Sequence, residues 1–507
     1  MANVPEITPR DEHNLALLSN VQPTDWTNPT PSGRYNMVVI GAGSAGLITA
    51  AVAAGLGAKV ALIERHFMGG DCLNVGCVPS KGVIRAARTV AEARSAARYG
   101  LQIPEDAEVD FAAVMERMRG VRARISKADA VARYQNELGV DVYLGDAHFV
   151  GRDAIEVGGA TLHFRRACIA AGARAAAPPL EGLADAGYLT NETIFNLTER
   201  PRRLGVIGAG PIGCELSQAF RRLGSEVTIF DRAEHVLARE DADAAEIVQR
   251  HFVEEGVRLE LGVRIEKIER RGDEKVIRIE GPGGSRECAV DEILVAVGRA
   301  PNVEGLDLET AGVEFDERRG VHVNDYLQTA NPHIYAAGDI CMRLKFTHAA
   351  DAAAKIVVQN ALFFRSAKVS SLVMPWCTYT DPEIAHVGLY EHEAHKQGIE
   401  IDTFQVGMEE IDRALADGEE DGFIKVHVKK GTDKILGATL VAAHAGELLS
   451  EITVAMVHGL GLSKIMKAIH PYPTQAEIIK RVAGAYTRSR ATPRVTKLLK
   501  GFMRLRR

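Results

Sequence analysis

The sequence predicts an α/β protein of several domains, and two observations support this fold class. The chain has 507 residues, which is too many for a single hydrophobic core. A glycine-rich strand-helix-strand unit also occurs twice, once from residue 35 and once from residue 203. Such units build Rossmann-like domains, so we expect two of these domains in one chain.

The first unit begins with the apolar strand 35–40 and ends with the strand 59–64. Three glycines between them would allow a tight turn, close approach of a pyrophosphate and packing of the helix on the strand: Gly41, Gly43 and Gly46. Glu64 closes the second strand, where a carboxylate can accept hydrogen bonds from a ribose. The order of strand, helix, strand and acid predicts a dinucleotide site.

The second unit repeats this order from the strand 203–207 to Asp231. Its glycines are Gly208, Gly210 and Gly213. Asp231 follows Gly213 by 18 residues, the same interval that separates Glu64 from Gly46. The simplest pair of dinucleotides is a flavin and a nicotinamide, because a nicotinamide delivers a hydride that a flavin can pass to a disulfide. Asp231 should repel a 2′-phosphate and favour NADH, whereas Arg232 could favour NADPH.

Cys72 and Cys77 carry the clearest chemical signal in the chain. The four residues between them let both sulfurs meet where a loop enters a helix, so the pair can cycle between dithiol and disulfide. A helix N-terminus and the nearby Lys81 would lower a thiol pKa and favour the reactive thiolate. The alternatives are a stabilising disulfide or a metal half-site. A zinc site needs further ligands, and none of the other five cysteines is paired at a matching spacing.

Composition and charge limit the classes of function. The chain is 46% apolar and 25% charged, as expected for a globular protein. Its formal net charge of -6 at pH 7 argues against nucleic acid as the main partner. Seven cysteines, an odd number, favour a reducing cytoplasm over a secreted disulfide framework, and residues 1–20 show no secretory signal.

Two dinucleotide units flanking a Cys-x4-Cys motif resemble the pyridine nucleotide-disulfide oxidoreductases, which include glutathione reductase, dihydrolipoamide dehydrogenase and mercuric reductase. The resemblance covers roughly residues 35–485. Gly338-Asp339 resembles the second FAD motif of the family, and Gly298 lies in a segment like the one that closes its NAD domain. Residues 380–383 resemble the start of its dimerisation domain.

The resemblance implies a fold of two Rossmann-like domains, for FAD and NAD(P), followed by a C-terminal α+β dimerisation domain. The expected boundaries are an N-terminal extended arm at 1–34, an FAD-binding domain at 35–176 and 303–370, an NAD(P)-binding domain at 177–302, a dimerisation domain at 371–487 and a basic amphipathic tail at 488–507. It also implies that Lys81 pairs with Glu215 beside the flavin, that Cys77 is the charge-transfer thiol and that Cys72 meets the substrate.

The chain departs from the disulfide-reducing members of the family at one motif. Their His-Pro-Thr-x-x-Glu motif contributes a histidine across the dimer that protonates the leaving thiolate. Here residues 470–477 read HPYPTQAE, so that alignment on Pro-Thr places Tyr472 at the histidine position and Glu477 at the end of the motif. An unperturbed tyrosine has a pKa of about 10, against about 6.5 for histidine, and is a poor acid-base group at neutral pH. His470 is either an alternative acid or a histidine at a helix end.

Mercuric reductase also has tyrosine at this position, and a soft metal ion held by two thiolates needs no general acid. By this resemblance Cys72 and Cys77 would bind the metal transiently as substrate. The chain lacks the C-terminal cysteine pair of mercuric reductase, because no cysteine follows Cys377.

Residues 494–507 predict a basic amphipathic helix. Its apolar residues recur every three or four positions: Val495, Leu498, Leu499, Phe502 and Leu505. The remaining positions are rich in Lys and Arg, which suits an anionic membrane surface. A helix docked on an acidic patch of the same protein, or a solvated tail, are the alternatives.

These observations together predict a homodimeric, FAD-dependent NAD(P)H oxidoreductase in the cytoplasm, with a peripheral position at the inner membrane face as a further expectation. Electrons would pass from NADH or NADPH through FAD to the Cys72-Cys77 disulfide, and on to a metal ion such as Hg(II) or a small molecule. One alternative is a disulfide reductase of the dihydrolipoamide dehydrogenase or glutathione reductase type. Another is a membrane-associated redox sensor.

Overall fold

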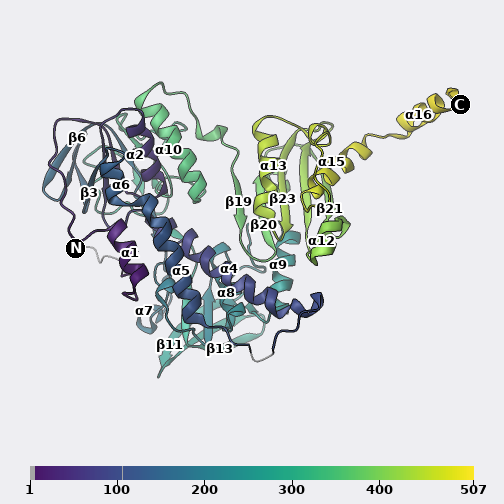
Figure 1. The fold of residues 1–507 in the computed structure, drawn as a ribbon, viewed down its shortest axis with the longest axis horizontal. Coiled ribbons are helices and arrows are strands. Elements are labelled where there is room, and N and C mark those ends of the chain that lie inside the picture. The colour runs from purple at the N-terminus through teal and green to yellow at the C-terminus, as the bar shows by residue number, and fades with distance from the viewer. Residues whose placement is uncertain (1–5, 105–106, 507) are drawn as a thin grey trace. The chain divides into compact units, whose positions relative to one another are not determined.

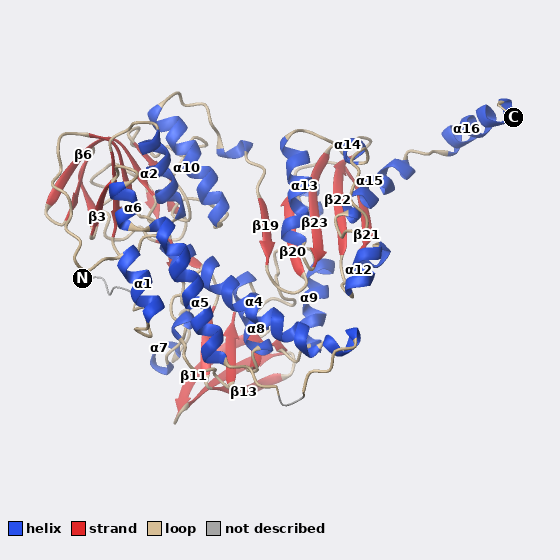
Figure 2. Cartoon of the chain, in the orientation of Figure 1, coloured by secondary structure: helices blue, strands red, loops and turns tan. Residues whose placement is uncertain are grey.

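The computed structural model describes residues 6–104 and 107–506 (Figure 1). Their contacts divide the chain into two compact units. Unit 1 comprises Met1–Arg232 and Gly256–Leu372, and unit 2 comprises Ala233–Glu255 and Val373–Arg507. The predicted α/β fold class is confirmed, since unit 1 holds two sheets of the dinucleotide-binding type and unit 2 holds a sheet with helices packed against it (Figure 2).

The first sheet of unit 1 has seven strands in the order β3-β2-β1-β6-β5-β4, with β18 pairing with β6. The strands are β1 (Tyr35–Ile40), β2 (Val60–Glu64), β3 (Asp141–Leu144), β4 (Ala147–Gly151), β5 (Ala154–Val157), β6 (Ala160–Ile169) and β18 (Ile334–Ala336). β1 pairs in parallel with both β2 and β6, and every residue of β2 is buried, as expected for a strand covered on both faces. Helix α2 (Ser44–Gly55) follows β1 and packs against α10 (Thr347–Leu362) (Figure 1).

The second sheet of unit 1 repeats the parallel arrangement in the order β10-β9-β8-β14. Its strands are β8 (Arg203–Ile207), β9 (Glu226–Phe230), β10 (Arg258–Glu260) and β14 (Glu292–Val295). Helix α8 (Pro211–Arg222) follows β8, with Gly210 as its N-cap and Pro211 in its first turn. An antiparallel meander adjoins this sheet, formed by β11 (Arg264–Arg271), β12 (Glu274–Gly281) and β13 (Gly284–Val290).

The N-terminal segment is not extended throughout, so the expectation for residues 1–34 was wrong. Residues Glu12–Val21 form helix α1, which packs against α5 (Phe111–Ser126). The Asp11 side chain caps this helix, and Leu17 and Val21 are buried at an i, i+4 spacing that is too short to stand out as a periodic pattern. Helix α1 is therefore part of the core of unit 1.

Unit 2 is built on a five-stranded antiparallel sheet in the order β19-β20-β23-β22-β21. The strands are β19 (Pro375–Thr378), β20 (Glu383–Gly388), β21 (Ile401–Gly407), β22 (Phe423–Lys429) and β23 (Ile435–Ala442). Helices α13 (Ala445–Val457) and α15 (Glu477–Ser489) pack on it through buried apolar residues. The shorter helices are α11 (Glu391–Lys396), α12 (Asp412–Asp417) and α14 (Leu462–Ile465), and α16 (Pro493–Leu505) follows α15.

One segment of the second dinucleotide-binding region belongs to unit 2. Helix α9 (Ala242–Glu254) contacts β20 and β23. Lys425 on β22 holds it in place, because its ammonium lies 2.7 Å from Asp241 and 2.8 Å from Asp243. At the other end of the helix, Asp421 accepts a hydrogen bond from Arg250 at 2.7 Å.

The remaining helices of unit 1 are α3 (Gly70–Asn74), α4 (Cys77–Arg94), α6 (Val131–Asn136) and α7 (Leu183–Ala186). Within residues 6–104 and 107–506, no helix is both long enough and apolar enough to cross a bilayer.

Candidate active site

The two cysteines lie where the short helix α3 meets α4. Cys72 is within α3, and Cys77 is the first residue of α4. The loop before them turns through Gly69 and Gly70, whose φ angles of 89° and 56° are in the left-handed region. A Cβ atom on Gly70 would lie 2.6 Å from the Cα of Gly43, so the cysteine loop packs directly on the first glycine-rich turn.

The two thiols differ sharply in acidity. No disulfide joins them in the structure, and the pKa of Cys77 is lowered from its ordinary value of 9.0 to about 6. The main cause is a hydrogen bond that the Cys72 thiol donates to the Cys77 sulfur; the Thr347 hydroxyl, whose Oγ1 lies 3.4 Å from that sulfur, and the charge of Lys81 add to it against the opposing effect of burial. The pKa of Cys72 is raised for the complementary reason. At neutral pH the pair is therefore a thiolate beside a thiol.

An ion pair joins the cysteine helix to the second dinucleotide-binding region. Nζ of Lys81 on α4 donates a hydrogen bond to Oε2 of Glu215 on α8 at 2.8 Å. The Glu215 side chain is buried, with 8% of its surface exposed. The two charges act oppositely on Cys77, because Lys81 lowers its pKa and Glu215 raises it.

The first glycine-rich turn fits the pyrophosphate of FAD. A Cβ on Gly46 would lie 1.7 Å from the carbonyl oxygen of Gly41, and one on Gly41 would lie 2.4 Å from that of Ala170. The fold itself therefore requires glycine at both positions. At Gly43 a Cβ would make only an ordinary contact, 3.8 Å from the Cα of Gly70, so the fold itself does not require glycine there, whereas close approach of a pyrophosphate to the backbone would.

The second turn has the same construction. A Cβ on Gly213 would lie 1.9 Å from the carbonyl oxygen of Gly208, whereas one on Gly210 would meet nothing within 4 Å. Asp231 accepts a hydrogen bond from the amide of Ala209 at 2.6 Å. The corresponding bond in the first unit runs from the amide of Ala42 to Glu64 at 2.7 Å, and both bonds span 22 residues. Both turns thus fit a dinucleotide, and each acid already contacts its glycine-rich turn.

Arg299 joins three of the segments that the sequence assigned to cofactor binding and redox chemistry. Arg299 on β15 (Arg299–Pro301) follows Gly298 and forms ion pairs with Asp71 and Asp339, at 3.2 Å in the case of Asp339. Burial raises the pKa of the Asp339 carboxyl, and the charge of Arg299 opposes that shift. Arg299, Asp71 and Thr347 were not among the site residues predicted from the sequence. Arg299 directly follows Gly298 and Asp71 directly precedes Cys72, so their positions beside predicted site residues could have identified them. No comparable signal in the sequence marks Thr347.

The residues of the HPYPTQAE segment belong to unit 2. Tyr472 is exposed and donates a hydrogen bond to Asp412 at 2.9 Å, which raises its pKa. The His470 side chain is 7% exposed and lies 3.1 Å from Glu451. Glu477 accepts a hydrogen bond from Arg481 at 3.2 Å. His470 is therefore buried against a carboxylate, whereas the phenol of Tyr472 is open to solvent.

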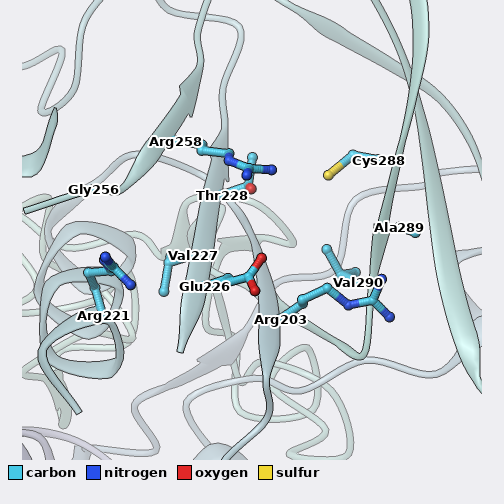
Figure 3. A pocket seen from close by; sticks show the side chains of 10 residues that line it. All are labelled: Arg203, Arg221, Glu226, Val227, Thr228, Gly256, Arg258, Cys288, Ala289 and Val290. Carbon is cyan, nitrogen blue, oxygen red and sulfur yellow. The ribbon is translucent and has the colours of Figure 1, made fainter. Parts of the chain in front are cut away.

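A separate small cavity lies in the second dinucleotide-binding region (Figure 3). Its volume is about 170 Å³, and it is lined at the start of strands β8, β9 and β10 by Arg203, Glu226 and Arg258, with Cys288 nearby. Nucleotides bind at the carboxyl ends of parallel strands, so this cavity is at the wrong edge of the sheet for a cofactor. In the described part of the chain, no three His, Cys, Asp or Glu side chains cluster in a way that could hold a resident metal ion.

Comparison with known proteins identifies the family. Residues 35–354 match the pyridine nucleotide-disulphide oxidoreductase family, and residues 374–483 match its dimerisation domain. The chain belongs to this family. Members use FAD and NAD(P)H, so the protein is a flavin-dependent oxidoreductase with two dinucleotide cofactors. Its dimerisation domain supports a homodimer.

Individual relatives carry different activities in their names. The chain is 36% identical over 451 residues to a mercuric reductase of Staphylococcus aureus, covering 89% of this chain and 82% of the relative. It is also 36% identical over 455 residues to a dihydrolipoyl dehydrogenase of Thermus scotoductus, covering 89% and 97%.

Solved structures show the same fold. A Cu(II) complex of the HOCl-induced flavoprotein disulfide reductase RclA from Escherichia coli superposes with a TM-score of 0.80 at 27% identity, covering 90% of this chain and all of that one. LpdA from Mycobacterium tuberculosis superposes with a TM-score of 0.80 at 27% identity, covering 89% and 99%.

Proposed function

We propose that this oxidoreductase uses NAD(P)H to reduce a thiophilic metal ion such as Hg(II) at the Cys72-Cys77 pair. The observation that carries the proposal is the cysteine pair where α3 meets α4, with the Thr347 hydroxyl 3.4 Å from the Cys77 sulfur, an arrangement in which the hydrogen bond from Cys72 lowers the pKa of Cys77. Two adjacent sulfurs at neutral pH match the preference of soft metal ions for thiolate ligands. Mercuric reductases among the relatives, and an RclA structure described as a Cu(II) complex, support this class of substrate.

FAD and the side chains of the site would divide the work. FAD, when bound, supplies a two-electron relay between NAD(P)H and the sulfur pair. Cys77 and Cys72 bind the metal, and the Cys72 proton leaves when its sulfur becomes a ligand. The ammonium of Lys81 stabilises the thiolate of Cys77. Glu215 positions Lys81 by accepting a hydrogen bond from its Nζ at 2.8 Å. Overall, NAD(P)H and Hg(II) would yield NAD(P)⁺, a proton and Hg(0).

Tyr472 supports a metal ion over a disulfide as the acceptor. Reduction of a disulfide ends with an alkyl thiolate that must be protonated, and a phenol with a raised pKa is a poor donor at pH 7. Hg(II) reduction needs no proton at the departing group. In the family the residue at this position comes from the partner subunit, so Tyr472 would act across a homodimer.

A disulfide reductase is the second candidate. It is favoured by the dihydrolipoyl dehydrogenase among the relatives and by the name of RclA, a disulfide reductase. His470 is a weak substitute acid because its side chain is buried against Glu451. In a disulfide reductase the leaving thiolate would then take its proton from solvent.

Oxidation of NADH and NADPH by the purified holoenzyme should be followed with Hg(II), Cu(II), lipoamide, glutathione disulfide and a soluble quinone. We expect turnover with a metal ion to exceed turnover with either disulfide, and Cys72→Ser to abolish it while FAD stays bound. Faster turnover with lipoamide or glutathione disulfide than with every metal ion would establish the second candidate instead. Turnover with none of these acceptors would favour a redox sensor.

A further inference from the structure

Two consecutive helices at the end of unit 2 have the same length and opposite environments. Helix α15 (Glu477–Ser489) and helix α16 (Pro493–Leu505) each have 13 residues and an apolar face. The apolar residues of α15, among them Ile478, Ile479 and Val482, are buried in the core of unit 2. No residue of α16 is buried. The fold therefore covers the first of these apolar faces and leaves the second uncovered.

The uncovered face of α16 is large and continuous. Leu498 is 74% exposed, and the side chains that flank it on the same side are Val495, Leu499, Phe502 and Leu505, each at least 43% exposed. Monomeric proteins seldom leave such a row of large apolar residues in water without a partner. A helix of this length is also only marginally stable alone in water, so covering the apolar face would stabilise α16 itself.

The other face of α16 selects the kind of partner. Its charged positions are Arg494, Lys497, Lys500 and Arg504, and no acidic residue follows Glu477 in the chain. Thr492 caps the helix by accepting a hydrogen bond from the amide of Val495, and Pro493 occupies its first turn, so the helix has a defined start. Cations beside an uncovered apolar stripe match a surface that is negative outside and apolar beneath.

We propose that α16 binds the surface of an anionic lipid bilayer and lies parallel to it. Leu498, Leu499 and Phe502 would enter the boundary between headgroups and acyl chains, while Lys497, Lys500 and Arg504 contact lipid phosphates. A nucleic acid would use the cations but leave the apolar stripe in water. A groove on another protein would have to combine negative charge with an apolar floor at one place. The surface of an anionic bilayer has negative headgroups above apolar acyl chains over its whole area.

The test is sedimentation of the full-length holoenzyme with vesicles of phosphatidylglycerol and phosphatidylcholine in equal amounts. We expect binding to these vesicles, little binding to pure phosphatidylcholine, and loss of binding as salt is raised. Each basic residue near such a surface changes affinity about fivefold, so Lys497→Gln, Lys500→Gln and Arg504→Gln together should weaken binding ~100-fold. A matched control replaces Lys429, Lys430 and Lys434 with Gln, which removes the same charge from a hairpin of unit 2 and should leave binding unchanged.

A second set of variants tests the apolar contact. Replacing Leu498, Leu499 and Phe502 with Ser should abolish vesicle binding without changing the thermal midpoint, because none of these side chains is buried. In Phe502→Trp, tryptophan emission should shift to the blue on adding anionic vesicles. The proposal fails if a protein ending at residue 490 sediments with anionic vesicles as well as the full chain does. It also fails if that shorter protein changes its oligomeric state in solution without lipid, because α16 would then dock on a second copy.

Discussion

The phenol of Tyr472 donates a hydrogen bond to Oδ2 of Asp412 at 2.9 Å. A carboxylate that accepts this hydrogen bond stabilises the protonated phenol, so the pKa of Tyr472 is raised above its ordinary value of 10.0. The hydroxyl therefore stays neutral at pH 7 and is a still weaker proton donor than an ordinary tyrosine. The phenol is thus held in a form suited to contact rather than to proton transfer.

Substitutions at Tyr472 should separate the two candidate activities. We expect Tyr472→His to raise reduction of lipoamide or glutathione disulfide, because general acid catalysis contributes about 10²- to 10⁴-fold. Tyr472→Phe should lower Hg(II) reduction if the phenol contacts the metal, and should leave disulfide reduction low. Steady-state NADH oxidation measures both, with Asp412→Asn as a control that keeps the phenol but removes the carboxylate charge beside it. Fast native turnover of a small disulfide, lost only in His470→Ala, would make His470 the acid.

The thiolate at Cys77 should appear in a pH profile. Because its pKa is lowered to about 6, the thiol is mostly ionised at pH 7 and becomes protonated as the pH falls through that value. Alkylation of the reduced protein by iodoacetamide, followed by peptide mapping, should therefore give a Cys77 rate that drops below pH 6. Cys72→Ala should move this midpoint upward, since the Cys72 hydrogen bond is the main cause of the shift. A midpoint near 9 in the native protein would contradict the assignment.

Lys81 and Glu215 should shift that midpoint in opposite directions. Lys81→Met removes a positive charge and should raise the pKa of Cys77, whereas Glu215→Gln removes a negative charge and should lower it. Lys81→Met also leaves the buried Glu215 carboxylate without its lysine, at a cost of about 1–3 kcal/mol in the free energy of unfolding. The same alkylation profile and a denaturant titration measure the two effects. Shifts of equal sign would show that the pair does not act through its charges.

Two neighbouring glycines of the second turn should respond differently to alanine. Gly213→Ala places a Cβ 1.9 Å from a backbone oxygen, so it should lower the thermal midpoint and abolish NADH binding together. Gly210→Ala meets nothing within 4 Å and should fold like the native protein, yet its methyl group should hinder the pyrophosphate and raise the KM for NADH. Calorimetry and NADH kinetics separate stability from binding. An unchanged KM in Gly210→Ala would place the coenzyme elsewhere.

The coenzyme preference should depend on Asp231. Its carboxylate should repel a 2′-phosphate, so we expect a higher kcat/KM for NADH than for NADPH. Asp231→Ser should lower the ratio of kcat/KM for NADH to kcat/KM for NADPH. Arg232→Ser should raise this ratio, because the exposed guanidinium of Arg232 is the cation nearest to Asp231 in the sequence. A native preference for NADPH would instead assign the dominant role to Arg232.

Local sequence patterns predicted the parts of the fold that repeat. The two glycine-rich turns and their acids could be found because their spacing is fixed within one strand-helix-strand unit: Gly46 packs on Gly41 and Gly213 on Gly208, and each acid bonds an amide 22 residues before it. Helix α1 was missed because its stability comes from packing on α5 and from Asn14, which accepts a hydrogen bond from the buried Arg122 at 2.7 Å. That contact joins residues 108 positions apart, and no local pattern encodes it.

The candidate site likewise combines residues that are close in the sequence with residues that only the fold brings together. Cys72, Cys77 and Lys81 lie within ten residues, so their spacing alone indicated redox chemistry. Thr347 contacts the Cys77 sulfur from a position 270 residues away, at the start of α10, and Arg299 reaches Asp71 across 228 residues. Side chains brought together over such separations depend on the completed sheet, which a single sequence does not display.

The packing of α9 has a consequence for how the protein comes apart. The two dinucleotide-binding regions look alike in sequence, yet the second one gives residues 233–255 to the neighbouring unit. Without that unit, Ala244, Val248 and Phe252 of α9 would lose their cover, and Asp241 and Asp243 would lose Lys425. A fragment spanning 177–302 should therefore be sensitive to proteases in α9. Helix α9 should melt together with the antiparallel sheet of unit 2, so damage to that sheet would also unfold a helix that lies more than 120 residues before it in the chain.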